Sequence, residues 1–280
     1  MKLRQLRNAT VVLTLGGRRL VVDPMLSDVG AMSGFKVFGG GRRRNPLVPL
    51  PACAEAELAR VDGVILTHEH PDHFDRPALA WMREQKLPVW ANAIDRASLA
   101  KKGVDVRPIE DGVFDAEGEV VRSRHGRGPL GWLMGPVAGY FVAAPGEPTL
   151  YLTGDAVLDE RVLEATTRLR PDVVVAPAGA ANMGLGGDIL FSVDELVRLA
   201  RAAPGAIVLN HLEALDHCPT TRAGLRARLA AEGLGERAHV PDDGEELTFD
   251  HAAGDRARPR ARADERPGVQ KWITAPFAGT

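Results

Sequence analysis

The stretch that decides the fold is Gly63-Val64-Ile65-Leu66-Thr67-His68-Glu69-His70-Pro71-Asp72-His73. Its first five residues form an apolar run typical of a buried strand, and the polar half begins where that strand should end. Three imidazoles and a carboxylate within six residues supply the nitrogen and oxygen ligands that zinc and similar cations prefer. In an extended turn, His68 and His70 can converge on one ion while Asp72 and His73 point toward another. The sequence therefore predicts a centre for two metal ions.

Two ions need further ligands, and three later residues could supply them because each follows an apolar run that predicts a strand. They are His125, Asp155 and His211. Strand ends from one side of a sheet sandwich converge on one edge. Taken singly, each position also has a plain structural interpretation, since a lone histidine is more often structural and Thr153-Gly154-Asp155 could merely start a turn. Only their combination with the histidine motif favours a metal site.

The remaining sequence predicts alternating strands and helices. Strands are expected at residues 10–15, 18–23, 63–67, near 89, 104–109, 119–123, 139–144, 149–153, 173–176, 206–210, and near 238 and 247. Helices are expected at 75–85, 158–169, 192–202 and 221–232, the third starting in a capping box formed by Ser192 and Glu195. Strands followed by helices, twice over, predict two sheets packed face to face with helices outside.

On these residues the chain resembles the metallo-β-lactamase-fold hydrolase superfamily, in which H-x-H-x-D-H is joined by a distant His, an Asp in a T/S-G-D turn and a final His. The resemblance covers about residues 8 to 249 and implies an α/β fold, the four-layer αββα sandwich of that type. It also implies two metal sites that share Asp155. The first site is implied to contain His68, His70 and His125, and the second Asp72, His73 and His211.

Within the superfamily the chain looks like the branch of the ascorbate-6-phosphate lactonase. That likeness rests on Asp23-Pro24-Met25-Leu26, Arg44-Asn45-Pro46-Leu47-Val48 and the run from His211 to Pro219. It implies that Asp23 orients a metal ligand, although Asp23 could also only open a turn. Zinc is the expected ion, with manganese or iron as alternatives, because the branch uses manganese in places.

Two divalent ions a few ångström apart can share a water, lower its pKa and polarise the electrophile that it attacks. The sequence thus predicts a binuclear hydrolase of a small ester, lactone or phosphodiester, in which Asp72 holds the second metal and orients the bridging hydroxide. His217 could protonate the leaving group, bind an anionic substrate or cap a helix. Cys218 is expected to be a small packed residue. A regulatory or binding scaffold without turnover and a di-iron redox protein are the alternatives.

Composition limits the partners that this chain can have. The 280 residues carry 35 Lys+Arg against 37 Asp+Glu, so no chain-wide basic field exists to attract nucleic acid. No apolar stretch approaches the roughly 20 residues that cross a bilayer, and two cysteines favour a reducing cytoplasm. We therefore expect a cytoplasmic protein with a small-molecule substrate, and neither nucleic acid nor membrane as partner.

Two segments lie outside the regular pattern. Residues 24–51 form a long irregular loop, a candidate lid, whose Arg42-Arg43-Arg44 could bind a carboxylate or phosphate or could simply be solvated. Residues 252–280 are rich in Arg and Pro and are expected to form a mobile tail that follows a hydrolase domain at 1–251. The apolar end of this tail, around Trp272 and Phe277, could dock on the same domain or on a second subunit.

Overall fold

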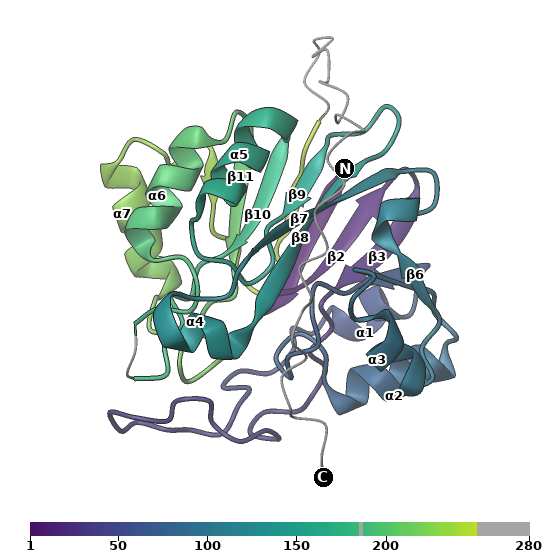
Figure 1. The fold of residues 1–280 in the computed structure, drawn as a ribbon, viewed down its shortest axis with the longest axis horizontal. Helices are drawn as coiled ribbons and strands as arrows, with labels where there is room; N and C mark the ends of the chain where they lie inside the picture. Colours follow the sequence, from purple (N-terminus) through teal and green to yellow (C-terminus); the bar gives the residue numbers. More distant parts are fainter. Residues whose placement is uncertain (185–186, 251–280) are drawn as a thin grey trace.

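The computed structural model describes residues 1–184 and 187–250, and the predicted tail lies outside the described residues. Two β-sheets pack face to face in the middle of the molecule, and helices cover the outer face of each sheet (Figure 1). The predicted four-layer αββα sandwich is confirmed. None of the helices in the described part of the chain is long and apolar enough to span a membrane.

The first sheet comes mostly from the N-terminal third of the chain. Its strand order is β13 (Glu246–Thr248), β1 (Lys2–Arg7), β2 (Thr10–Leu15), β3 (Arg18–Val22), β4 (Gly63–Ile65), β5 (Val89–Ala91) and β6 (Val106–Pro108). The strands from β13 to β3 pair antiparallel, whereas β3, β4, β5 and β6 are parallel. The carboxyl ends of β3 and β4 therefore lie at the same edge, and the histidine motif follows β4 directly.

The second sheet has the order β12 (Ala238–His239), β11 (Ala206–Asn210), β10 (Val173–Pro177), β9 (Leu150–Leu152), β8 (Pro136–Ala143) and β7 (Glu117–Arg124). Strands β9 to β12 are parallel, and β8 is antiparallel to both of its neighbours. It follows that β7, β9 and β11 run in the same direction. Their carboxyl ends carry the three later candidate ligands to one edge of the sandwich.

Burial of apolar side chains explains the layers. The core between the sheets contains Leu13, Tyr140 and Val175, all nearly inaccessible. Helices α1 (Ala54–Leu58), α2 (Arg76–Glu84) and α3 (Arg96–Lys101) cover the first sheet, and α5 (Glu160–Leu169), α6 (Val193–Ala202) and α7 (Arg222–Ala231) cover the second (Figure 1). A 3₁₀ turn η1 (Ile109–Asp111) precedes β7, and α4 (Gly128–Met134) connects β7 to β8.

Local signals in the sequence located the longer helices within about two residues. The Asp75 carboxylate caps α2 by accepting from Ala78 N at 2.9 Å, and Ser192 with Glu195 forms the predicted capping box of α6. The predicted elements lacked β1, α1, α3 and α4. Strand β1 was not predicted because its sequence lacks the alternation typical of a half-buried strand. Arg7, a residue type expected at the surface, is fully buried in it.

Candidate metal centre

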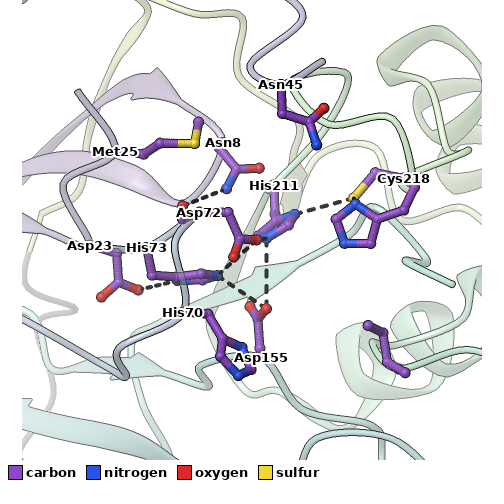
Figure 2. A network of polar contacts seen from close by, with 12 residues as sticks. Asn8, Asp23, Met25, Asn45, His70, Asp72, His73, Asp155, His211 and Cys218 are labelled. Carbon is purple, nitrogen blue, oxygen red and sulfur yellow. Dashed lines mark hydrogen bonds and ion pairs between the residues drawn. The ribbon is translucent and has the colours of Figure 1, made fainter. Parts of the chain in front are cut away.

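All seven sequence-predicted ligands meet at the edge of the sandwich where the parallel strands end. The structure brings them together in two groups, and within each group the candidate ligand atoms lie within 4.8 Å of one another. The first group contains His68, His70 and His125; the second contains Asp72, His73, Asp155 and His211. Figure 2 shows the second group from close by, with Asp155 facing both His73 and His211.

The first group consists of imidazoles only. His68 Nε2 lies 3.0 Å from His70 Nδ1, and the rings of His70 and His125 have their centroids 5.1 Å apart. Burial lowers the pKa of all three, and neighbouring histidines lower it further for His70, whose pKa falls to about 4. These rings are therefore neutral at pH 7, which is the state in which an imidazole binds a metal.

The second group alternates carboxylates and imidazoles. His73 Nε2 lies 3.1 Å from Asp155 Oδ2, and His211 Nε2 lies 3.2 Å from Asp72 Oδ2. Burial alone would lower the pKa of His73, but Asp155, Asp72 and Asp23 raise it to about 10; for His211 too the nearby negative groups outweigh burial. The same histidines hold the pKa values of Asp72 and Asp155 below the ordinary range, against the effect of burial. In the absence of an ion, protons on these histidines balance two buried carboxylates.

Asp155 lies between the groups. Its Oδ2 is 3.1 Å from His73 Nε2 and 3.7 Å from His211 Nε2 in the second group. The same oxygen is 3.7 Å from His125 Nε2 and 4.0 Å from His68 Nε2 in the first. One carboxylate oxygen thus faces four imidazole nitrogens, which is the position that the resemblance implies for a bridging ligand.

A separate partner holds the Nδ1 atom of each of four candidate ligands. The Nδ1–H groups of His68 and His73 donate to Thr67 Oγ1 and Asp23 Oδ2, both at 2.9 Å, and that of His125 donates to the carbonyl oxygen of Ile189 at 2.9 Å. His211 Nδ1 lies 3.6 Å from the Sγ of Cys218. With Nδ1 engaged, Nε2 of each ring points toward the centre, which is how a ligand histidine is normally held.

These partners sharpen the sequence interpretation. Asp23 does orient a histidine of the motif, and it also accepts from the backbone N–H and the hydroxyl of Thr67, both at 2.7 Å. Cys218 is packed, as expected, but its thiol also contacts a candidate ligand. The contributions of Thr67 and of the Ile189 carbonyl were missed, and no residue pattern signals them.

The backbone is held in unusual conformations around the second group. Asn8, Asp23 and His211 all adopt the left-handed region, with φ of 56°, 47° and 59°, and such strain in non-glycine residues is typical of functional sites. Asn8 connects two parts of the group, because its side-chain amide donates to Asp72 O at 3.0 Å and its carbonyl oxygen accepts from His211 N at 3.0 Å. Asn8 was also missed, since nothing in the sequence around it signals a site.

The residues of the centre suit a divalent metal. Among the described residues, His73 Nε2 is a buried polar atom without a well-aligned hydrogen-bond partner, although a carboxylate lies next to it. The ion pairs that Asp72 and Asp155 form with described residues are all with histidines, and none is with lysine or arginine. A cation accounts for both observations, and nitrogen with oxygen ligands is the donor set of zinc, manganese or non-haem iron.

A cavity of about 140 Å³ opens beside the centre, with Asp72 and Asp155 in its lining. The rest of its wall is largely apolar and includes Phe35, Met134, Met183 and Ile189. His217 lies in the same wall, almost entirely buried, with its ring perpendicular to that of Phe35 at 5.3 Å between centroids. A second cavity of about 300 Å³ lies on the other side of His70 and His125 and has a more polar lining.

Comparison with known proteins identifies the family. Residues 18–212 match the family model described as the beta-lactamase superfamily domain. The chain belongs to the beta-lactamase superfamily. A curated superfamily relative, the UPF0173 protein YddR of Bacillus subtilis, is 31% identical over 254 residues, covering 89% of this chain and all of that protein.

Two solved structures are also similar. The isothiocyanate hydrolase from Delia radicum gut bacteria is 32% identical with a TM-score of 0.82, over 90% of this chain and 100% of that one. A possible metal-dependent hydrolase from Veillonella parvula is 27% identical with a TM-score of 0.83, over 89% and 99% of the two chains. The predicted enzyme class, a metal-dependent hydrolase of the beta-lactamase superfamily, is confirmed, while the resemblance to the ascorbate-6-phosphate lactonase branch stays a prediction.

Proposed function

We propose that this protein is a binuclear metal-dependent hydrolase of a small, uncharged electrophile. The observation that carries the proposal is the position of Asp155, one oxygen of which faces histidines of both groups at 3.1 to 4.0 Å. A shared carboxylate between two donor sets supports two neighbouring ions. His68, His70 and His125 would hold the first ion, Asp72, His73 and His211 the second, and Asp155 both.

Bound divalent ions supply a water of lowered pKa and polarise the electrophile. The chain itself performs the remaining tasks. Asp72, the carboxylate of the second group that is not shared, is buried in the cavity wall, where its oxygen can accept a hydrogen bond from an attacking water and fix the direction of attack.

His217 is proposed as the proton donor to the leaving group. Burial would lower its pKa, but the neighbouring Cys218 and Asp72 raise it above the ordinary value, which favours the protonated ring that a proton donor needs. Its position in the cavity wall fits a contact with substrate. A helix cap, the alternative considered for His217, is not its main environment, because the ring packs on Phe35.

The cavity lining favours an uncharged substrate. Five of its ten lining residues are apolar, and no lysine or arginine among the described residues belongs to the lining. The side chains of Arg42 and Arg44 donate to loop carbonyls at Gly34, Gly30 and Ala31, so they serve the loop structure in this conformation. Among the predicted substrates, a small ester or lactone therefore fits better than a phosphodiester.

An isothiocyanate is a second substrate candidate. It is the substrate class in the name of a structure that is 32% identical over 90% of this chain. The central carbon of an isothiocyanate is an uncharged electrophile, and a small apolar cavity suits the organic group attached to its nitrogen.

The proposal is tested by loading the purified protein with zinc, manganese or iron and measuring metal content and hydrolysis on a panel of esters, lactones, isothiocyanates and phosphodiesters. We expect about two ions per chain and turnover of an uncharged member. One ion or none at saturation contradicts the binuclear site. Two ions without hydrolysis of any class favour the regulatory scaffold, and oxygen consumption by the iron form favours the redox alternative.

A cytoplasmic location and a mobile tail after residue 251 stay predictions.

A further inference from the structure

The long loop at residues 24–51 is fixed at its base. The Arg7 side chain is fully buried, and its guanidinium donates to Met25 O and Ser27 O, each at 2.8 Å, and to Val48 O at 3.0 Å. Both ends of the loop are therefore held by one residue of β1. The tip around Gly39–Gly41 is exposed.

The middle of this loop closes around Asp216. The carboxylate of Asp216 accepts from Phe35 N at 2.9 Å, Arg43 N at 3.1 Å and Asn45 Nδ2 at 3.0 Å, and from Lys36 N at 3.3 Å. In return Asp216 N donates to Asn45 Oδ1 at 2.9 Å. The side chain of Asp216 has no exposed surface, so a lost partner would leave a covered, charged oxygen without its hydrogen bond, which is costly.

Gly34 shows how closely the loop fits this carboxylate. A Cβ added to Gly34 would lie 2.3 Å from Arg43 O and 2.5 Å from Asp216 Oδ2. Both distances are far below van der Waals contact, and backbone is among the atoms that would have to move. The two limbs of the loop are therefore packed against each other with Asp216 between them.

This arrangement controls one wall of the substrate cavity. Phe35 donates its backbone N–H to Asp216, and its ring packs perpendicular to that of His217 and lines the cavity. The next part of the loop is held as well, since Val37 N and Phe38 N donate to Met183 O at 3.2 and 3.0 Å. The position of the Phe35 ring thus depends on bonds made to its own backbone.

We propose that Phe35 is a specificity-determining residue that limits the length of the substrate's apolar group, and that Asp216 is its positioning residue. The inference rests on the proposed function, because it takes the cavity to be the substrate site. Asp216 does not line the cavity and acts through the loop. The predicted lid is, on this interpretation, a fixed wall.

Ligand length tests the role of Phe35 without requiring turnover. Alkyl hydroxamates bind metal through their head group, and the affinity of the zinc-loaded protein for a series of increasing chain length would be measured by calorimetry. Phe35→Ala should raise the affinity ratio of long to short ligands about tenfold or more, because each methylene that fits an apolar pocket contributes severalfold. An unchanged ratio would overturn the assignment.

The two residues should act as one unit. Asp216→Ala should shift the ratio in the same direction as Phe35→Ala, and the double variant should match Phe35→Ala alone. Arg43→Ala is the matched control. It keeps the backbone N–H that donates a hydrogen bond to Asp216, so the affinity ratio of long to short ligands should not change. Additive effects in the double variant, or an equal effect of Arg43→Ala, would contradict a positioning role.

Trypsin gives a readout that is independent of metal and ligand. Arg42, Arg43 and Arg44 are exposed at the loop, and cleavage there depends on how often the loop opens. Asp216→Ala should accelerate cleavage at these arginines about tenfold or more, since several hydrogen bonds to a charged group are lost, while Phe35→Ala should change it less. An unchanged cleavage rate in Asp216→Ala would overturn the claim that Asp216 holds the loop in place. Failure to hydrolyse any member of the substrate panel would instead refute the proposed function and leave these results intact.

Discussion

The two groups of candidate ligands lie side by side at one edge of the sandwich, yet they differ in charge. The first contains three imidazoles whose pKa values lie below the ordinary value, and the second contains two buried carboxylates with histidines whose pKa values lie above it. An ion bound by the first group would meet neutral ligands. An ion bound by the second would replace protons that balance the carboxylates. The two groups should therefore differ in how they respond to pH and to mutation.

The largest effect is expected for the residue that belongs to both groups. Asp155→Asn keeps the shape of the side chain but removes the negative charge that faces four histidines. Turnover should fall on the order of a thousandfold, because the charge serves both ions. Elemental analysis should find fewer than two ions per chain. A variant that retains two ions and full turnover would show that Asp155 is not shared.

The next largest effect separates the second group from the first. Asp72→Asn should lower turnover about a hundredfold or more, since the buried carboxylate both faces His211 and lines the cavity. The fold should survive, which circular dichroism would check. His217→Ala is the comparison, with a smaller loss of turnover and unchanged metal content. Near-normal turnover in Asp72→Asn would refute the mechanism even with the fold correct.

The difference between the groups also separates what the sequence could predict from what it could not. The seven candidate ligands were found because they follow apolar runs, and parallel strands bring such positions together. The charge balance could not be found, because it depends on which histidine faces which carboxylate. His70 and His73 are three residues apart in one motif, yet their pKa values shift in opposite directions.

The fold divides in the same way. Strand β11 and the cap of α6 follow from local sequence, and the structure reproduces both. The short helices α1, α3 and α4 carry too few residues for a clear periodicity. From the sequence, Asp216 was noted only as part of the run from His211 to Pro219 and was given no role, because its hydrogen bonds are to a loop more than 170 residues earlier in the chain.

Orientation of a single histidine gives a third test of the difference. Asp23 accepts from His73 Nδ1 at 2.9 Å, so Asp23→Asn should weaken binding of the second ion about tenfold to a hundredfold. Binding of the first ion should weaken less, because Asp23 reaches His68 only through the hydroxyl of Thr67. Titration of metal-free protein with cobalt, followed by absorption, would resolve the two steps. If both binding steps weakened equally, Asp23 would not act mainly on the second group.

The pH dependence of metal binding provides the fourth test. Because the pKa of His73 is raised to about 10, this histidine carries its proton at pH 8 in the metal-free protein and must lose it when an ion binds. Each proton released makes the affinity rise about tenfold per pH unit, so His73 and His211 together should raise affinity at the second group up to about a hundredfold per unit between pH 7 and 9. The first group, already neutral, should show little change. Calorimetry in buffers of different ionisation enthalpy measures the protons released.

The stability of the metal-free protein should change with pH in the direction opposite to its metal affinity. A raised pKa in the folded state stabilises metal-free protein fully below the ordinary value of 6.5, and that stabilisation is lost as the pH rises toward 10. Metal-free protein should therefore melt at a lower temperature at pH 9 than at pH 7, whereas metal-loaded protein should change less. Equal pH dependence of both forms would contradict the proton balance assigned to His73.

The smallest effect concerns the only sulfur among the groups that orient these histidines. Cys218 Sγ lies 3.6 Å from His211 Nδ1, against 2.9 Å for the oxygen that orients His73, and a sulfur acceptor is weaker than a carboxylate. Cys218→Ala should therefore weaken binding of the second ion only a few-fold, which is less than the effect of Asp23→Asn. Cys218→Ser should restore part of that loss if its hydroxyl reaches Nδ1, and the same cobalt titration would show it. A loss in Cys218→Ala as large as that in Asp23→Asn would mean that the thiol itself binds the ion. No change in either cysteine variant would mean that the thiol does not fix the ring of His211.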